Sequence, residues 1–204
     1  MMAEGGYNFK FSTTAPVRMC FTGEPACIYK YNPDFLRQFT HVVTAQDVKQ
    51  YLPSTIVYNY QQCLCPLIGL KDGKFDTNEV TVTLGSTHKT KLLSAIVSNK
   101  CYTELHRKRR IFLERLKHDI PQLDLFGSGT GNQLLMKDLA LREYQFSIAI
   151  ENCSDNDYWT EKLSDCILSN CDVIYCGCRN ISKYFDGITT IDIDDYEKSL
   201  VVIR

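Results

Sequence analysis

One stretch, residues 144–177, constrains the fold of this chain more than any other. It opens with apolar side chains at alternate positions of 146–150, a spacing typical of a half-buried strand. A polar loop follows over 151–157, then an amphipathic segment that begins near Thr160, and then a second apolar run at 173–175 before a glycine. This succession of strand, loop, helix and strand predicts one unit of a parallel α/β sheet.

The loop and first helical turn of this unit gather polar side chains. They are Asn152, Tyr158, Glu161 and Lys162. A helix N-terminus offers free backbone amides and the positive end of a dipole, which together favour phosphate. Because Lys162 would add a mobile positive charge to that turn, the stretch predicts a site for a phosphate-bearing ligand.

Strand and helix signals alternate along the rest of the chain, which predicts a mostly parallel α/β sheet. The expected strands are 17–21, 41–44, 55–60, 92–97, 123–126 and 188–193, with a further edge strand at 79–84. The expected helices are 33–39, a weak one at 45–52, 102–118, 137–142 and 196–201. SGTGN, after the strand at 123–126, is expected to be a flexible loop because it does not complete G-x-G-x-x-G.

Composition excludes several classes of function. A net charge of −1 over 204 residues argues against bulk attraction to nucleic acid or to an anionic membrane. The N-terminal MMAEGGYNFKF has no basic region and no apolar core, so we do not expect a signal peptide. No apolar run approaches the roughly 20 residues of a membrane span. We therefore expect a cytoplasmic protein.

The ten cysteines are expected to be mostly reduced thiols in such a compartment. The C-x-C pairs Cys63/Cys65 and Cys176/Cys178 have zinc-ligand residue types, but we favour small buried side chains. The D-x-D pairs Asp155/Asp157 and Asp192/Asp194 have a form that can hold a divalent metal, and we favour loop and helix-cap roles for them. The predicted site therefore includes no metal.

Two further features carry charge. The run HRKRR at 106–110 is interpreted mainly as a solvated helix face. Of the functions considered for the chain, nucleic-acid binding through this run ranks last. One arginine of the run could reach a ligand at the sheet edge. Glu24 follows the strand expected at 17–21, at the carboxyl edge where open α/β sheets bind ligands. Taken alone, Glu24 would be interpreted as a turn residue.

The opening stretch resembles the donor-binding signature of glycosyltransferase family 10, the α-1,3/1,4-fucosyltransferases. The family pattern runs close to KF-x(4)-EN, then Tyr-x-TEK, then an apolar run to a glycine; this chain has QFSIAIEN, YWTEK at 158–162 and VIYCG. IVSN followed by R-x-x-F-x-x-x-L at 109–116 also resembles bacterial members, as does FTGE at 21–24. The resemblance is strong over 92–193 and weaker before it.

The resemblance implies a GT-B-like α/β fold, with two Rossmann-like lobes and the active site in the cleft between them. The expected domains are a flexible N-terminus at 1–16, an acceptor-side lobe at 17–85 and a GDP-sugar donor-binding lobe at 86–204. Family members usually have many more residues before the TGE-like segment, so the N-terminal lobe is expected to be small or truncated.

The resemblance also implies a function. The chain would be an inverting glycosyltransferase, an α-1,3-fucosyltransferase, that moves fucose from GDP-fucose to a hydroxyl of a glycan acceptor. Glu24 would be the general base, and Arg109 and Lys162 would stabilise the leaving GDP. Asn152, Tyr158 and Glu161 would hold the nucleotide ribose and the sugar. The family needs no metal or other cofactor for this reaction.

Two alternatives remain open. The first is another donor, such as GDP-mannose or GDP-rhamnose, with the same nucleotide contacts. The second is a degenerate, non-catalytic module that binds nucleotide sugar or glycan, suggested by the short N-terminal lobe. Val173 and Cys176 stand where the family usually has Pro and Trp. The sequence leaves the acceptor and the oligomeric state open.

Overall fold

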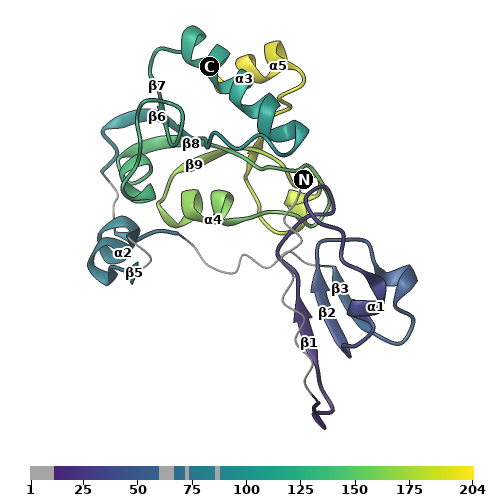
Figure 1. Ribbon diagram of the computed structural model, residues 1–204. Helices are drawn as coiled ribbons and strands as arrows, with labels where there is room; N and C mark the ends of the chain where they lie inside the picture. The colour runs from purple at the N-terminus through teal and green to yellow at the C-terminus, as the bar shows by residue number, and fades with distance from the viewer. Residues whose placement is uncertain (1–11, 60–66, 72–73, 86–87) are drawn as a thin grey trace.

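The computed structural model describes residues 12–59, 67–71, 74–85 and 88–204, and these form two parallel sheets and a small hairpin (Figure 1). The strands are β1 (Met19–Phe21), β2 (His41–Thr44), β3 (Ile56–Asn59), β4 (Leu70–Lys71), β5 (Lys74–Phe75), β6 (Lys91–Ile96), β7 (Leu123–Phe126), β8 (Tyr144–Ile150), β9 (Asp172–Cys176) and β10 (Thr189–Thr190). The α-helices are α1 (Pro33–Leu36), α2 (Thr77–Leu84), α3 (Glu104–Asp119), α4 (Glu161–Leu168) and α5 (Tyr196–Ile203). Short 3-10 turns are η1 (Lys49–Tyr51), η2 (Lys137–Ala140) and η3 (Ile181–Lys183).

The larger sheet has the strand order β10-β9-β8-β6-β7, and every pairing in it is parallel. From β6 the chain first adds β7 on one side, then returns to place β8 on the other. The direction of winding therefore reverses between β6 and β8. In open α/β sheets, ligands bind outside the carboxyl ends of the strands at such a switch point.

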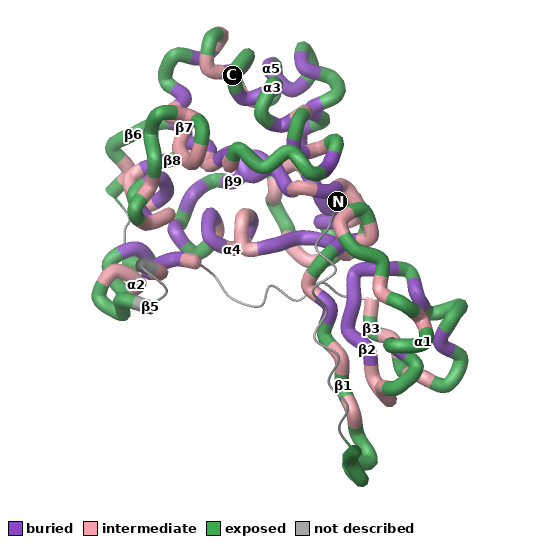
Figure 2. The backbone as a smooth tube through the Cα atoms, in the orientation of Figure 1, coloured by how far each residue is buried: buried purple, intermediate pink, exposed green. Residues whose placement is uncertain are grey.

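Helices cover both faces of this sheet (Figure 1). On one face, Ile148 and Ile150 pack with residues of α3 and α5. On the other face, Ala149 packs with Trp159 and with residues of α4. Because both faces are covered, the end of β8 is buried continuously over 147–150 and does not alternate (Figure 2).

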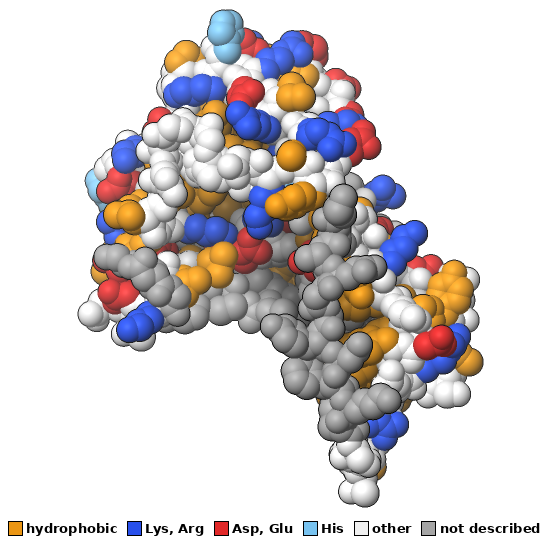
Figure 3. Space-filling model, in the orientation of Figure 1, with side chains coloured by type: hydrophobic (Ala, Val, Ile, Leu, Met, Phe, Trp, Pro, Cys, Tyr) orange, Lys and Arg blue, Asp and Glu red, His pale blue; other side chains and the backbone are white. Residues whose placement is uncertain are grey.

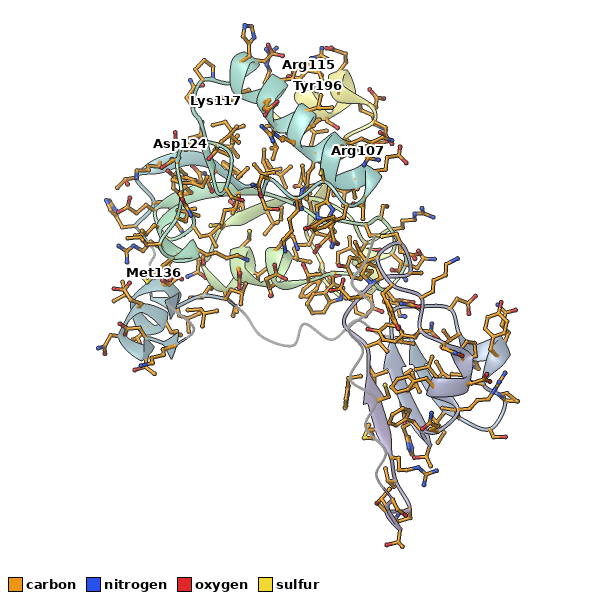
Figure 4. All side chains as sticks on the ribbon, viewed as in Figure 1. Arg107, Arg115, Lys117, Asp124, Met136 and Tyr196 are labelled. Atoms are coloured by element: carbon orange, nitrogen blue, oxygen red, sulfur yellow. The ribbon has the colours of Figure 1, made fainter. Side chains whose placement is uncertain are left out.

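The outer side of α3 is bound to the last helix by aromatic and charged contacts. The Arg115 guanidinium lies 3.5 Å from the centre of the Tyr196 ring, and the Tyr196 hydroxyl donates to Asp119 at 2.5 Å (Figure 4). Phe112 meets the same tyrosine ring edge-on from the core side. These contacts hold α3 to α5, and residues of both helices pack with β6 and β8 in one core cluster.

The smaller sheet has the order β1-β2-β3, also parallel. Its core is built from Leu36, Val42, Val48 and Leu52. The α/β class with parallel sheets, predicted from the alternation of elements, is therefore confirmed.

Residues 67–71 and 74–85 are attached to the lobe that contains the larger sheet, without adding a strand to that sheet. The amide of Leu67 donates to Asp165 at 2.8 Å, and the amide of Gly69 donates to the buried carboxylate of Asp138 at 2.9 Å. Further along this segment, α2 is tied down by an ion pair to Arg142. We therefore propose that the boundary between the lobes lies before Leu67, and not after position 85; residues 60–66 lie outside the described part of the chain.

The segment 79–84, expected to be an edge strand, is helical and lies within α2. Asp76 caps that helix by accepting hydrogen bonds from the amides of Asn78 and Glu79, at 2.9 and 3.3 Å. The alternating VTVT pattern indicated a strand, but the cap satisfies the first free amides of a helix and decides the conformation. The prediction for this segment was wrong.

Two other expectations need correction. The weak helix expected at 45–52 contains only the 3-10 turn η1. Gln46 holds this region in a turn, because its side-chain amide donates to the carbonyls of Glu24 and Tyr29 at 2.9 and 2.7 Å. The helix expected at 137–142 is likewise a 3-10 turn. The other expected strands and helices are present, several of them shorter.

Candidate functional site

A cavity of about 450 Å³ opens at the carboxyl ends of β6 and β8, where the order of the larger sheet reverses. Every predicted site residue except Tyr158 lines it, and these residues are Glu24, Arg109, Asn152, Glu161 and Lys162. Acidic and basic side chains lie side by side in a hollow over α4 on the face that Figure 3 presents. The site is therefore a charged cavity at the position where the topology predicts a ligand.

Arg109 bridges the two strands at the switch point. Its Nη2 donates to the hydroxyl of Ser98, just after β6, at 3.0 Å, and its Nη1 donates to the carbonyl of Ile150, the last residue of β8, at 3.3 Å. Its Nε is buried and has no hydrogen-bond partner among the described residues. The residue is only 3% exposed, and no carboxylate of the described chain forms an ion pair with it. Burial lowers the pKa of this guanidinium, partly offset by the charge of Glu151.

Arg109 is the one arginine or lysine of the basic run that turns inward. Lys108 pairs with Glu104 and Asp194 at 2.8 Å each, and Arg110 pairs with Glu114 at 2.8 Å. Arg107 donates to a backbone carbonyl at the surface. The other cations of this run therefore lie on a solvated helix face, with their charges largely matched by neighbouring carboxylates.

Asn152 and Tyr158 form a pair. The buried Tyr158 hydroxyl donates to Oδ1 of Asn152 at 2.7 Å, and only Asn152 lines the cavity. Burial, with the charges of Glu151 and Glu24, raises the pKa of Tyr158, so the hydroxyl keeps its proton. The structure therefore places Tyr158 behind Asn152, where it orients the amide.

Glu151 is a fully buried carboxylate that the sequence interpretation passed over. One oxygen accepts from the amide of Thr160 at 2.8 Å, and the other accepts from the Thr160 hydroxyl at 2.7 Å. The second oxygen also lies 3.3 Å from Nζ of Lys162. Glu151 thus holds the residue that caps α4 and fixes the start of that helix at the cavity. The EN dipeptide at the end of a buried strand was the sequence signal available for it.

A chain of charges continues from α4 along the cavity wall. Lys162 lies 3.3 Å from Glu161, and Lys137 lies 3.4 Å from Glu161 and 3.0 Å from Asp165. Burial alone would raise the pKa of Glu161, but Lys162 and Lys137 outweigh it and hold the pKa at about 2. Burial raises the pKa of Asp165 despite its ion pair with Lys137. Glu161 is therefore a fixed anion at the cavity, and Lys137 is a cation that the sequence interpretation missed.

His106 was also missed. It belongs to the basic run at 106–110, yet it is only 4% exposed and lines the cavity one turn before Arg109. Burial and the charges of Arg109, Lys162 and Lys100 lower its pKa to about 4, so the ring is neutral at neutral pH. In the sequence, a histidine inside a run of cations looks like a surface residue. No sequence pattern therefore indicated that His106 is buried.

Glu24 reaches the cavity from the smaller sheet. It follows β1 in an exposed turn, and its carbonyl accepts from the side chain of Gln46. Thr22, just before it, is buried and hydrogen-bonds to Thr44 of β2 at 2.7 Å. The turn is thereby fixed to the smaller sheet, while the Glu24 carboxylate remains open to solvent and lines the cavity.

Both D-x-D pairs have roles within the fold. Asp157 accepts from Asn180, Lys183 and Tyr184. Asp192 accepts from the amide of Asp194. Among the residues that the structure describes, no group of three or more His, Cys, Asp or Glu side chains is placed to hold a metal ion.

The described cysteines are free thiols, and most of those in the larger lobe are buried. Burial raises the pKa of Cys166 to about 12 and that of Cys171 to about 11, as expected for small apolar side chains in a core. Cys63 and Cys65 lie outside the described residues. No helix in the described part of the chain is long and apolar enough to cross a membrane.

Residues 86–202 match the family model of glycosyltransferase family 10 (fucosyltransferase) C-term, over more than half of the chain. Crystal structures of α1,3-fucosyltransferase with GDP-fucose and with GDP are similar to this chain, each with 18% identity and a TM-score of 0.59. They cover 92% and 91% of this chain, respectively, and 61% of their own. A further crystal structure of α1,3-fucosyltransferase has 17% identity and a TM-score of 0.56, over 92% of this chain and 59% of its own.

The chain therefore spans about 61% of the length of these solved structures. No curated protein sequence matches it significantly. At this level of identity the structural likeness establishes the fold alone, and the predicted GT-B-like α/β fold is confirmed.

Proposed function

The chain belongs to glycosyltransferase family 10, and from that premise we propose that it transfers fucose from GDP-fucose to a hydroxyl of a glycan acceptor, with inversion. The observation that supports the proposal most strongly is the environment of the Arg109 guanidinium. It is buried at the switch point, it has one unpartnered N–H, and no described carboxylate pairs with it. A buried charge without a partner is costly, and an anionic ligand in the cavity would remove that cost.

A diphosphate fits this position well. Arginine offers several donors in a planar fork that matches phosphate oxygens, and here the fork is held by Ser98, just after β6, and by Ile150, at the end of β8. Negative charge builds on the diphosphate as the bond to the sugar breaks. A fixed donor in a buried site stabilises that charge more than it stabilises the ground state.

Lys162 would supply the second cation. Its Nζ lies at the start of α4, shared between Glu151 and Glu161 at 3.3 Å each. The free amides and dipole of the helix add positive potential at the same place. We propose that Lys162 exchanges its contact with Glu161 for a phosphate oxygen when donor binds.

Asn152 and Glu161 would contact the nucleotide ribose and the sugar. Glu161 keeps its charge, because the neighbouring lysines hold its pKa at about 2, so it can accept hydrogen bonds from ribose hydroxyls. Tyr158 would act through Asn152 as a positioning residue, because its hydroxyl is committed to the Asn152 side chain. This refines the expectation that Tyr158 itself touches the donor.

Glu24 would be the general base. Its carboxylate takes the proton of an acceptor hydroxyl, whose oxygen forms a bond to the anomeric carbon from the face opposite the diphosphate. The bond between that carbon and the diphosphate breaks, and its electron pair leaves with GDP. One such displacement converts a β-linked donor into an α-linked product. Because Glu24 comes from the smaller sheet, the acceptor would enter between the two lobes.

A transfer assay with a panel of donors tests this proposal. We expect GDP-fucose to be consumed, with release of GDP and formation of an α-fucoside that the coupling constant of its anomeric proton identifies. GDP-mannose in parallel separates fucose transfer from transfer of another sugar. Calorimetric binding of GDP without turnover on any acceptor would favour a non-catalytic nucleotide-sugar module instead.

A further inference from the structure

A second hydrogen-bond donor lies on α3 beside the proposed diphosphate site. His106 precedes Arg109 by three residues, so the two side chains project from the same face of the helix. Both are buried, and both line the cavity. Of these two residues, the proposed mechanism uses only Arg109.

The cap of α3 determines which nitrogen of His106 carries the proton. The backbone amide of Thr103 donates to Nδ1 of His106 at 3.2 Å, and the His106 amide donates back to the Thr103 hydroxyl at 3.0 Å. The position of a backbone amide hydrogen is fixed, so Nδ1 must present a lone pair. The Thr103 hydroxyl lies 2.6 Å from the carbonyl of Asn152 and 2.9 Å from Nδ1, and donating to either leaves Nδ1 an acceptor. The proton of the neutral ring therefore sits on Nε2.

Nε2 is free to serve a ligand. It makes no hydrogen bond to any residue that the structure describes, and it is not among the described buried atoms that are sealed from solvent without a partner. The ring lines the cavity, and the ring of Tyr102 stands nearly perpendicular to it, with the two ring centres 6.2 Å apart. His106 therefore offers an N–H donor that has no partner among the described residues, on a ring that lines the same cavity as Arg109.

The groups around the ring explain why a neutral donor suits this place. The charges that face it are Arg109 on the same helix, Lys162 at the start of α4 and Lys100 in the loop after β6. A further cation here would be repelled by all three. A neutral imidazole adds a hydrogen bond for an anion without adding to that repulsion.

We propose that His106 donates a hydrogen bond from Nε2 to the diphosphate of the donor nucleotide sugar, beside Arg109. The inference rests on the proposed function, because it deepens the same anion site. A cap of α3 alone would explain the hydrogen bonds of Nδ1, but it would not explain why a ring with an unpartnered N–H lines the cavity.

The test is a pH titration of the histidine ring nitrogens by NMR, on protein with ¹⁵N-labelled histidine, without GDP and with saturating GDP. Without GDP we expect the Nε2–H tautomer and a low pKa. A diphosphate beside the ring favours its charged form, so GDP should raise the pKa of His106. His41, His88 and His118 do not line the cavity and serve as internal controls whose signals should not move.

Two variants complete the test. Thr-x-x-Gln is a recognised capping box, so His106→Gln keeps an acceptor for Thr103 and a donor for the cavity, whereas His106→Leu removes both. We expect His106→Leu to weaken GDP binding by about tenfold or more, and His106→Gln to recover most of that loss.

The outcomes are distinguishable. Failure of wild-type protein to bind GDP would overturn both the proposed function and this inference. GDP binding that leaves the His106 signals unchanged would overturn the inference alone. A folded His106→Leu protein with wild-type GDP affinity would do the same.

Discussion

A Cβ atom placed on Gly177 would lie 2.4 Å from Cγ of Glu151, so the glycine at the end of β9 makes room for the buried carboxylate at the end of β8. The backbones meet there as well, because the amide of Glu151 donates to the carbonyl of Cys176 at 2.9 Å. Through Thr160, Glu151 then holds the start of α4 at the cavity. The glycine that follows the apolar run of 173–175 is thus needed for the position of Glu151, and through Glu151 for the geometry of the site.

Replacement of Gly177 by alanine should therefore damage both stability and the site. We expect Gly177→Ala to lower the free energy of unfolding by about 1–3 kcal/mol, the usual range for overpacking, and to weaken GDP binding. Urea unfolding and calorimetry measure the two effects. Gly85→Ala is the matched control, because Gly85 has ordinary backbone angles and, among the described residues, its Cβ would meet two backbone carbonyl oxygens, the nearer at 3.2 Å. Equal effects of the two substitutions would contradict this account of Gly177.

Arg109 should matter for the ligand more than for the fold. We expect Arg109→Met to weaken GDP binding by about 1.5–3 kcal/mol, the range for hydrogen bonds to charged groups. The ligand-free protein should keep or gain stability, because a buried charge without an ion-pair partner is replaced by an apolar side chain. Calorimetry and thermal unfolding give both values.

Arg110→Met is the control for that experiment, since Arg110 is the next residue on α3 and its ion pair with Glu114 is exposed. It should change neither quantity appreciably. A large loss of stability in Arg109→Met with unchanged GDP affinity would show that Arg109 is structural.

Glu24→Gln should separate binding from chemistry. The amide keeps the size of the side chain but cannot accept the proton of the acceptor hydroxyl. We expect GDP affinity to stay unchanged and turnover to fall by on the order of 10²-fold or more. Asp34→Asn, an exposed carboxylate in the same lobe paired with Arg37, should leave turnover unchanged. Normal turnover in Glu24→Gln would exclude Glu24 as the base.

His106 makes stability depend on pH in a defined window. Its pKa is about 4 in the folded protein, against an ordinary value of 6.5, so the unfolded chain binds its proton first. The contribution of neutral His106 to the free energy of unfolding is therefore fully present above pH 6.5 and is lost as the pH falls toward 4. We expect wild-type protein to lose about 1–3 kcal/mol more than His106→Gln between pH 7 and pH 4, measured by urea unfolding. Parallel curves for the two proteins would contradict a low pKa in the folded state. Glu161 titrates with a pKa of about 2, so its contribution is lost mainly below this window.

Much of the larger lobe follows from local sequence pattern. The strand, loop, helix and strand of 144–177 fall where apolar spacing and the cap at Thr160 place them, because both faces of this unit are buried. The family resemblance singled out Arg109 from five consecutive cationic or titratable residues, and the structure places it in the cavity wall. Periodicity alone could not have separated it from Arg110.

The rest depends on tertiary contacts that no local pattern contains. The alternating residues of 79–84 fit a strand equally well, and the Asp76 cap decides for a helix. Glu151 and His106 have titratable side chains, and residues of these types usually lie at the surface. They are buried here because β8, β9 and α3 pack together around them. Glu24 lies near the anion site because of the way the two sheets meet. The local sequence of neither lobe contains that information.

The central claim is that the buried guanidinium of Arg109 binds the diphosphate of the donor, and a crystal structure of the protein with GDP tests it most directly. We predict diphosphate oxygens within hydrogen-bond distance of the guanidinium of Arg109 and of Nζ of Lys162, in the cavity at the ends of β6 and β8. GDP bound at another place, with no ligand atom in contact with the Arg109 guanidinium, would contradict the account.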